Sequence, residues 1–341
     1  AVVDSRPRAP GTASAAAYGA RRAQLKAGQA DRARVNLAAA ARFPHTFYGL
    51  LAQRTLGEAP QLRWTAPKLT AAHVAAVGRS GAGARAIALL QVGEFEAAEQ
   101  ELRRVSANQG GAVMKEALLA LAERGGMAAL ALQLGNLVAA PDGGAYDGAL
   151  YPLPHWKPRD GFQVDRAMLY AVARLESRFD PGLVARTGAS GLLQIMPATA
   201  RYVRNRHEDI DDASRAALLD PADNLEMGQR YIAELMQMPI VGANMFYLGA
   251  AYNAGPGNLA RWRKQFRDVK DPLLFIESLP FGETREYLEK FLANYWIYRL
   301  RLGQDVSSLD DVAAGRWPLY TPLDTHHSKV QPAAVSEDAE D

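Results

Sequence analysis

Hydrophobic positions recur with helical spacing along the first part of the chain. Residues 13–138 are rich in Ala and Leu with short Gly or Pro interruptions, which predicts stacked helical hairpins. The segment 86–105, AIALLQVGEFEAAEQELRRV, is typical of such a unit. Because no fixed period recurs, we expect an irregular helical array rather than a regular repeat. The aromatic residues Phe47 and Tyr48 are expected to pack in its core.

The helical pattern stops at residues 140–161, where Gly and Pro cluster, and we place a domain boundary there. No run of strand length alternates with a period of two, so both parts are predicted to be all-α. We expect an irregular, superhelical domain at 1–150, a second helical domain at 151–305 and an extended, largely disordered tail at 306–341. In the second domain, helices are predicted at 165–179, from Pro197, at 222–236, at 242–253 and at 283–302.

Two segments outside this pattern need their own interpretation. The most apolar window, MAALALQLGNLVAA at 127–140, is short and contains three polar or Gly positions, so it predicts a buried helix and no transmembrane segment. The tail contains too few apolar residues to offset its ordering entropy. Its paired His326 and His327 have the chemistry of metal ligands, but a solvated tail is the simpler interpretation.

Composition excludes several classes of function. Lys and Arg number 39 against 37 Asp and Glu, so no basic surface points to nucleic acid. The chain has no Cys, which excludes a thiol nucleophile and a thiolate metal site. It opens AVVDSRPRAPGTAS without a basic and apolar leader, so we expect any signal peptide to have been removed already. We expect no cofactor and no metal.

One carboxylate stands out in the second domain. The predicted helix at 165–179 places Met168, Val172, Leu175 and Phe179 on one buried stripe, and Glu176 lies at its margin. Partial burial disfavours the charged form of a carboxyl and raises its pKa, as a general acid requires. The alternative is a solvated Glu at a helix edge.

The loop after Glu176 contains features that favour a ligand site. Gly182, Gly188 and Gly191 precede an apolar run, and glycines allow a backbone to approach a ligand closely. Gln194 is the one polar side chain within that run and must find hydrogen-bond partners in the protein or in a ligand. Pro197 then begins a new helix.

Four motifs follow one another along the second domain: Glu176-Ser177-x-Phe179-Asp180-Pro181, GLLQIMPATA at 191–200, AYNAGPG at 251–257 and LPFGETREY at 279–287. Together, and in this order, they resemble the motifs of the soluble lytic murein transglycosylases, a lysozyme-like family. Smaller matches at Asp220, Pro221, Asn224, Gly228 and Tyr231 resemble a helix of that family on which small residues allow close packing. The resemblance covers about 162–302, and the helical part before it weakly resembles the same family's superhelical region.

The resemblance implies cleavage of the MurNAc-β-1,4-GlcNAc bond of peptidoglycan without water, which leaves 1,6-anhydroMurNAc ends. It implies a bacterial, periplasmic protein of cell-wall remodelling or turnover, and we expect it to be a monomer. Glu176 would be the catalytic acid and base, and the substrate-binding residues would be Gly191, Gln194, Met196, Tyr252, Asn253 and Glu283.

Structural alternatives stay open for three of these residues. Tyr252 is also explained as a core aromatic, Asn253 as a turn or cap residue, and Glu283 as a favourable charge at a helix N-terminus. The chain also departs from the family at Ala185, where a Ser commonly lies near the carboxylate. We expect that contact to be either absent or replaced, with Thr187 as a candidate.

Two other functions remain possible. A goose-type lysozyme-like hydrolase would share the fold and the Glu but use a water, usually positioned by a further carboxylate. A non-catalytic peptidoglycan-binding helical scaffold would need neither.

Overall fold

The computed structural model describes residues 9–108, 111–204 and 216–324, and these residues are helical with no β-strand among them. Three isolated bridges are the only β-type pairing in that part of the chain. The predicted all-α class is therefore confirmed. The chain divides into a large unit, residues 1–61, 158–177 and 181–341, and a small unit, residues 62–157 and 178–180.

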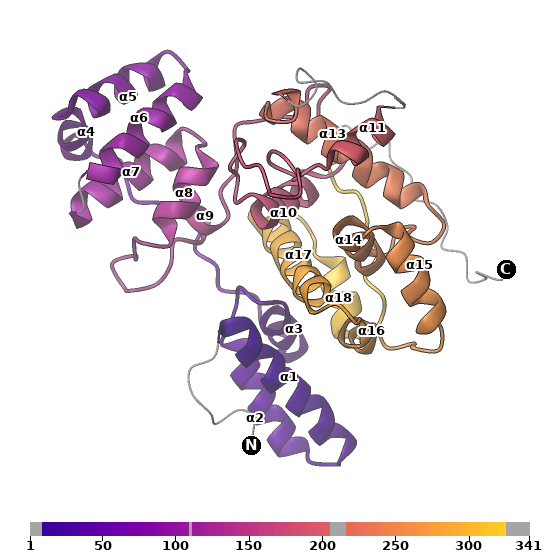
Figure 1. Cartoon of the computed structure of the whole chain (residues 1–341). Coiled ribbons are helices and arrows are strands. Elements are labelled where there is room, and N and C mark those ends of the chain that lie inside the picture. The colour runs from indigo at the N-terminus through magenta and orange to yellow at the C-terminus, as the bar shows by residue number, and fades with distance from the viewer. Residues whose placement is uncertain (1–8, 109–110, 205–215, 325–341) are drawn as a thin grey trace. The chain divides into compact units, whose positions relative to one another are not determined.

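The small unit is a stack of short helices joined by tight turns (Figure 1). Thr70 and Ser80 cap two of them, each accepting a hydrogen bond from a backbone N–H three residues ahead. The apolar window at 127–140 becomes a buried helix with Leu130 and Leu134 fully buried, as its length predicts. The helices are α4 (Ala71–Gly78), α5 (Gly81–Gln91), α6 (Phe95–Asn108), α7 (Ala112–Arg124), α8 (Ala128–Gly135) and α9 (Asp147–Leu150).

The large unit is also helical and contains the motif segments except residues 178–180, which belong to the small unit. The five helices predicted there all form, with ends within three residues of the expected ones. Among the helices that the structure describes in this unit, three short ones were not predicted, and two of these, α15 and α16, begin at prolines in the first turn. The helices are α1 (Pro10–Lys26), α2 (Ala30–Ala41), α3 (Phe47–Leu56), α10 (Arg166–Glu176), α11 (Pro197–Val203), α13 (Pro221–Gln237), α14 (Met245–Ala254), α15 (Pro256–Gln265), α16 (Pro272–Ser278), α17 (Gly282–Arg301) and α18 (Ser307–Ala313).

The grouping of the first three helices differs from the expected boundary at residue 150. Helix α3 packs against α17 and α18, so α1 to α3 belong to the large unit. The Phe47 ring stacks on Trp296 with centroids 5.2 Å apart, and Tyr48 donates a 2.5 Å hydrogen bond to Glu277. Phe47 and Tyr48 are core residues, as predicted, but of the large unit.

The predicted disorder of the tail is wrong for residues 306–324. Residues 307–313 form α18, and residues 317–324, here called the strap, run back over the large unit. Met245 N–H donates to the Pro318 carbonyl at 2.9 Å, and Tyr320 N–H donates to the Ala243 carbonyl at 2.7 Å. These backbone hydrogen bonds and the buried Tyr320 ring offset the ordering cost that composition alone suggested. His326 and His327 lie outside the described residues.

Candidate active site

Glu176 is the last residue of α10, at the edge of a buried stripe. Met168 and Val172 of that stripe are at most 2% exposed. The helix ends because Arg178 and Phe179 both adopt left-handed backbone angles, φ 55° and 65°, which an α-helix cannot continue. The carboxyl of Glu176 is thus placed at a chain reversal, half-buried.

The pKa of Glu176 is raised to about 7, mainly by burial and in part by the negative charge of Glu283. The hydroxyl of Tyr287 acts in the opposite direction and lowers the pKa of Glu176. This hydroxyl is buried and has no hydrogen-bond partner among the described residues, and it lies close enough to the Glu176 carboxyl to act on its pKa. A carboxyl in this balance exchanges a proton near neutral pH.

Tyr287 ends the motif LPFGETREY, and the sequence alone assigns it no role. It lies four residues after Glu283 on α17, so both side chains share one helix face. This spacing is the signal in the sequence that could have identified Tyr287. Residues four apart lie on the same helix face, so a helix that places Glu283 near the site also places Tyr287 near it. Burial and the neighbouring charge of Glu176 raise the pKa of Tyr287 well above its ordinary value, so it remains a neutral phenol.

Tyr252 lies near Glu176, and its hydroxyl binds the protein backbone. It donates to the Leu193 carbonyl at 2.8 Å, and its ring lies 5.5 Å from the Tyr231 ring. Burial and the charge of Glu176 raise the pKa of Tyr252 well above its ordinary value. Tyr252 therefore joins α14 to the loop that follows Glu176, and its ring lies beside the Tyr231 ring.

The loop at 181–196 is fixed by Asn224, which is fully buried on α13. Its side chain accepts from Leu193 N–H at 2.8 Å and donates to the carbonyls of Ser190 and Leu218 at 2.9 and 2.8 Å. Gly191 has φ 76°, and a Cβ there would lie 2.2 Å from the Leu218 carbonyl oxygen. The backbone approach that Gly191 permits is thus to the protein itself.

Gln194 also stabilises this loop. Its backbone has φ 47°, unusual for a residue with a side chain, and its amide nitrogen donates to the carbonyls of Leu183 and Gly191 at 3.0 and 2.9 Å. The polar side chain within the apolar run has therefore found protein partners. Met196 differs, since its side chain is 39% exposed at the start of α11.

Asn253 and Glu283 lie at neighbouring helix ends. The Asn253 side-chain oxygen accepts from the Thr284 hydroxyl at 2.8 Å, and Thr284 is 1% exposed, so this contact joins the end of α14 to the start of α17. Glu283 is exposed in the first turn of α17, where a carboxylate is favoured by the helix dipole. Its charge nevertheless acts on Glu176.

Ala185 takes part in the loop through its backbone. Its N–H donates to the Ala189 carbonyl at 2.9 Å, and its carbonyl accepts from Gly188 N–H at 2.8 Å. Thr187 is exposed on the same turn. The hydroxyl that acts on the Glu176 carboxyl is that of Tyr287, from a different segment of the chain.

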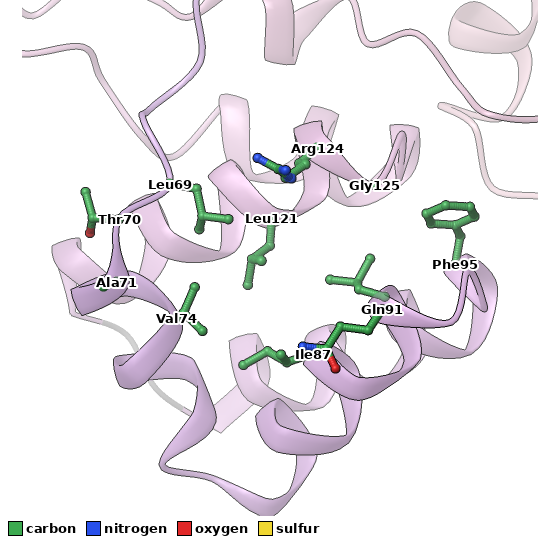
Figure 2. Close-up of a pocket in the computed structure, with 11 residues that line it drawn as sticks. Leu69, Thr70, Ala71, Val74, Ile87, Gln91, Phe95, Leu121, Arg124 and Gly125 are labelled. Carbon is green, nitrogen blue, oxygen red and sulfur yellow. The ribbon is translucent and has the colours of Figure 1, made fainter.

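A hollow of about 620 Å³ lies apart from Glu176, in the small unit (Figure 2). Val74, Ile87 and Leu121 line it with other mainly apolar side chains, and no carboxyl group is among the residues that line it. It lacks the acid that glycosidic cleavage requires. Among the described residues, no group of three or more His, Asp or Glu side chains is arranged to hold a metal ion.

Residues 156–275 match the family model described as "Transglycosylase SLT domain". This part of the chain is similar to SLT domains. The soluble lytic murein transglycosylase of Escherichia coli K12 is 35% identical over 156 residues, 46% of this chain and 24% of that protein. That of Salmonella typhimurium is 36% identical over 151 residues, 44% of this chain and 23% of that protein.

Similarity of fold extends beyond the residues that match this family model. The crystal structure of the 70 kDa soluble lytic transglycosylase of E. coli matches with a TM-score of 0.69 and 25% identity, over 90% of this chain and 48% of that one. The lytic transglycosylase Slt of Pseudomonas aeruginosa matches with a TM-score of 0.63 and 23% identity, over 86% of this chain and 47% of that one. The chain thus spans about half of these structures and about a quarter of the curated relatives.

Proposed function

We propose that this chain is a peptidoglycan lytic transglycosylase that cleaves the MurNAc-β-1,4-GlcNAc bond and leaves 1,6-anhydroMurNAc ends. The observation that carries the proposal is a single carboxyl, Glu176, whose burial raises its pKa to about 7 within an SLT domain. A group with this pKa is protonated often enough to act as an acid and is ionised easily enough to act as a base at neutral pH.

In the first step, protonated Glu176 donates its proton to the glycosidic oxygen while the bond to the muramic C1 breaks. The GlcNAc side leaves as an alcohol, and positive charge develops at C1 in an oxocarbenium-like state. In the second step, the Glu176 carboxylate removes the proton of the muramic C6 hydroxyl. The C6 oxygen bonds to C1 and closes the anhydro ring, so that Glu176 is protonated again and no water is consumed.

The neighbours of Glu176 suit these two opposite tasks. Burial and the charge of Glu283 favour the protonated acid before cleavage. After donation, the hydroxyl of Tyr287 favours the carboxylate, because a hydrogen-bond donor stabilises the charged form. One carboxyl can thus serve both steps, and intramolecular attack by C6 benefits from proximity.

For the sugar contacts, we propose Met196 and Glu283, which are exposed, as direct ligands. Gly191, Gln194 and Asn253 are proposed to form the wall of the site mainly through backbone shape, since their polar groups bind other parts of the chain. The Tyr252 ring is proposed to line the site beside Glu176, with its hydroxyl holding the loop.

The proposed location is the periplasm, where peptidoglycan is found, and the proposed state is a monomer. Among the described residues, no helix has both the length and the apolar character needed to cross a bilayer. The names of the relatives support the cell wall as the substrate.

Muropeptide analysis tests the proposed activity. Purified sacculi are digested with the wild-type chain and with Glu176→Gln, and the released fragments are identified by mass spectrometry. We expect anhydro-muramyl ends from the wild type and none from the variant. Reducible muramic ends would instead indicate a hydrolase, and no release by the wild type would indicate a non-catalytic scaffold.

A further inference from the structure

Helices α10 and α17 lie side by side in the large unit (Figure 1). Polar side-chain contacts join them at more than one point. At one end, the Asp165 carboxylate accepts from Arg299 Nη2 at 2.6 Å. Further along, Arg174 Nη1 donates to Asn294 Oδ1 at 2.9 Å. These contacts define an antiparallel register, and that register brings Glu176, at the other end of α10, beside Tyr287.

Asp165 precedes the first turn of α10, yet its side chain does not cap this helix. It is fully buried and turned toward the strap, where the N–H groups of Leu323 and Asp324 donate to its carboxylate at distances of 2.9 to 3.1 Å. A carboxylate in this position would ordinarily stabilise its own helix. Here its hydrogen bonds join α10 to two other segments.

Arg299 completes the arrangement from α17. It is 2% exposed, and Nη2 also donates to the Thr321 carbonyl at 2.6 Å. A buried ion pair is tolerated only when both charges keep their partners, because either charge alone would be buried without compensation. The pair with Asp165 therefore permits one arrangement of α10, α17 and the strap and opposes displacement from it.

The end of the strap adds a second connection to the same end of α10. Asp324 accepts from Arg166 N–H at 2.8 Å and from its guanidinium at 3.1 Å. Gln304 also donates to Asp324 at 2.6 Å. The first turn of α10 is thus held by side-chain and backbone hydrogen bonds from residues after α17.

We propose that Asp165 is a positioning residue. Through its ion pair with Arg299 and its hydrogen bonds to the strap, it fixes α10 against α17 and thereby places the Glu176 carboxyl beside Tyr287. The eleven residues of α10 form a rigid rod about 16 Å long, so a shift at its first turn is transmitted to its last. The inference rests on the proposed function for its effect on turnover. Its effect on Glu176 itself is independent of any substrate.

The test compares Asp165→Asn and the milder Asp324→Asn with a control, Leu309→Ala, in the full chain. Leu309 is buried in α18 and belongs to no part of the proposed site, so this control measures a loss of core packing alone. For each folded protein, the pKa of Glu176 is followed by NMR with ¹³C-labelled Glu, and the resonance is assigned by its absence in Glu176→Gln. Turnover on soluble glycan strands is measured in parallel.

We expect Asp165→Asn to lower the pKa of Glu176 by about one, because a displaced α10 exposes the carboxyl to water. We expect kcat to fall about ten-fold or more with KM little changed, since a misplaced acid affects the reacting step. Asp324→Asn should show a smaller change in the same direction, and it decides the question if Asp165→Asn does not fold. Leu309→Ala should leave the pKa of Glu176 unchanged.

An unchanged pKa of Glu176 in both folded Asp variants, or in Asp324→Asn alone where Asp165→Asn does not fold, would overturn the positioning role. An equal change in Leu309→Ala would also overturn it, because general loosening would then explain the effect. If the wild type releases no muropeptides, the proposed function fails, while the NMR comparison still tests the placement of Glu176.

Discussion

Replacement of Glu176 by Gln should stabilise the protein, and increasingly so as the pH rises. Gln resembles the protonated acid in shape and charge, so it removes only the cost of ionising a buried carboxyl. Folding raises the pKa of Glu176 from 4.5 to about 7. The folded state therefore binds this proton more tightly than the unfolded state, and wild-type stability is lost as the pH rises from about 4.5 to about 7.

The magnitude follows from these two pKa values. Each pKa unit corresponds to about 1.4 kcal/mol, so the full difference amounts to about 3 kcal/mol of unfolding free energy at pH 8. At pH 4 the carboxyl is largely protonated in both states, and the variant should match the wild type. Other buried acids, such as Glu289 with its pKa raised to about 7 by burial, titrate in both proteins and cancel in the comparison.

The assay is urea unfolding at several pH values between 4 and 8, followed by Trp fluorescence. The difference in unfolding free energy between Glu176→Gln and the wild type is plotted against pH. We expect it to rise from near zero toward about 3 kcal/mol, with most of the change between pH 4.5 and 7. A difference that stays constant across this range would show that Glu176 ionises like a solvated Glu and would refute the reasoning.

Three further substitutions test the surroundings of the acid. Tyr287→Phe removes the hydroxyl that lowers the pKa of Glu176, so the ¹³C NMR titration should move upward by up to about one unit. Glu283→Gln removes a negative charge and should move the same titration downward by less than one unit, with a smaller effect in high salt because Glu283 is exposed. Gly191→Ala should cost about 2–4 kcal/mol in urea unfolding, from left-handed strain and the clash with Leu218, and a cost below about 1 kcal/mol would contradict this.

The sequence predicts α10 and α13 from apolar residues that recur on one helix face, and α11 from the proline at its first position. It misses α15, α16 and α18, which span ten residues or fewer and show no such stripe. It also misassigns the first three helices. The contact between Phe47 and Trp296 joins positions about 250 residues apart, and local periodicity contains no information on such a pairing.

The same distinction applies to the site. Glu176 was identifiable from its helix margin and its motif, because both are local features. The partners of Gln194 were not, since its two carbonyl acceptors are presented by a loop whose shape depends on Asn224 of another helix. Polarity within an apolar run predicts that hydrogen-bond partners exist but does not say whether they belong to the protein or to a ligand.

The structure relates the stability of the large unit to the chemistry proposed for it. Burying Glu176 beside the charge of Glu283 disfavours the ionised form that the second catalytic step requires, and the same burial keeps the acid of the first step protonated near neutral pH. The Tyr287 hydroxyl moderates this conflict only if α10 keeps its register against α17. Glu176, the last residue of α10, therefore depends on the ion pair between Asp165 and Arg299 of α17 at the other end of α10.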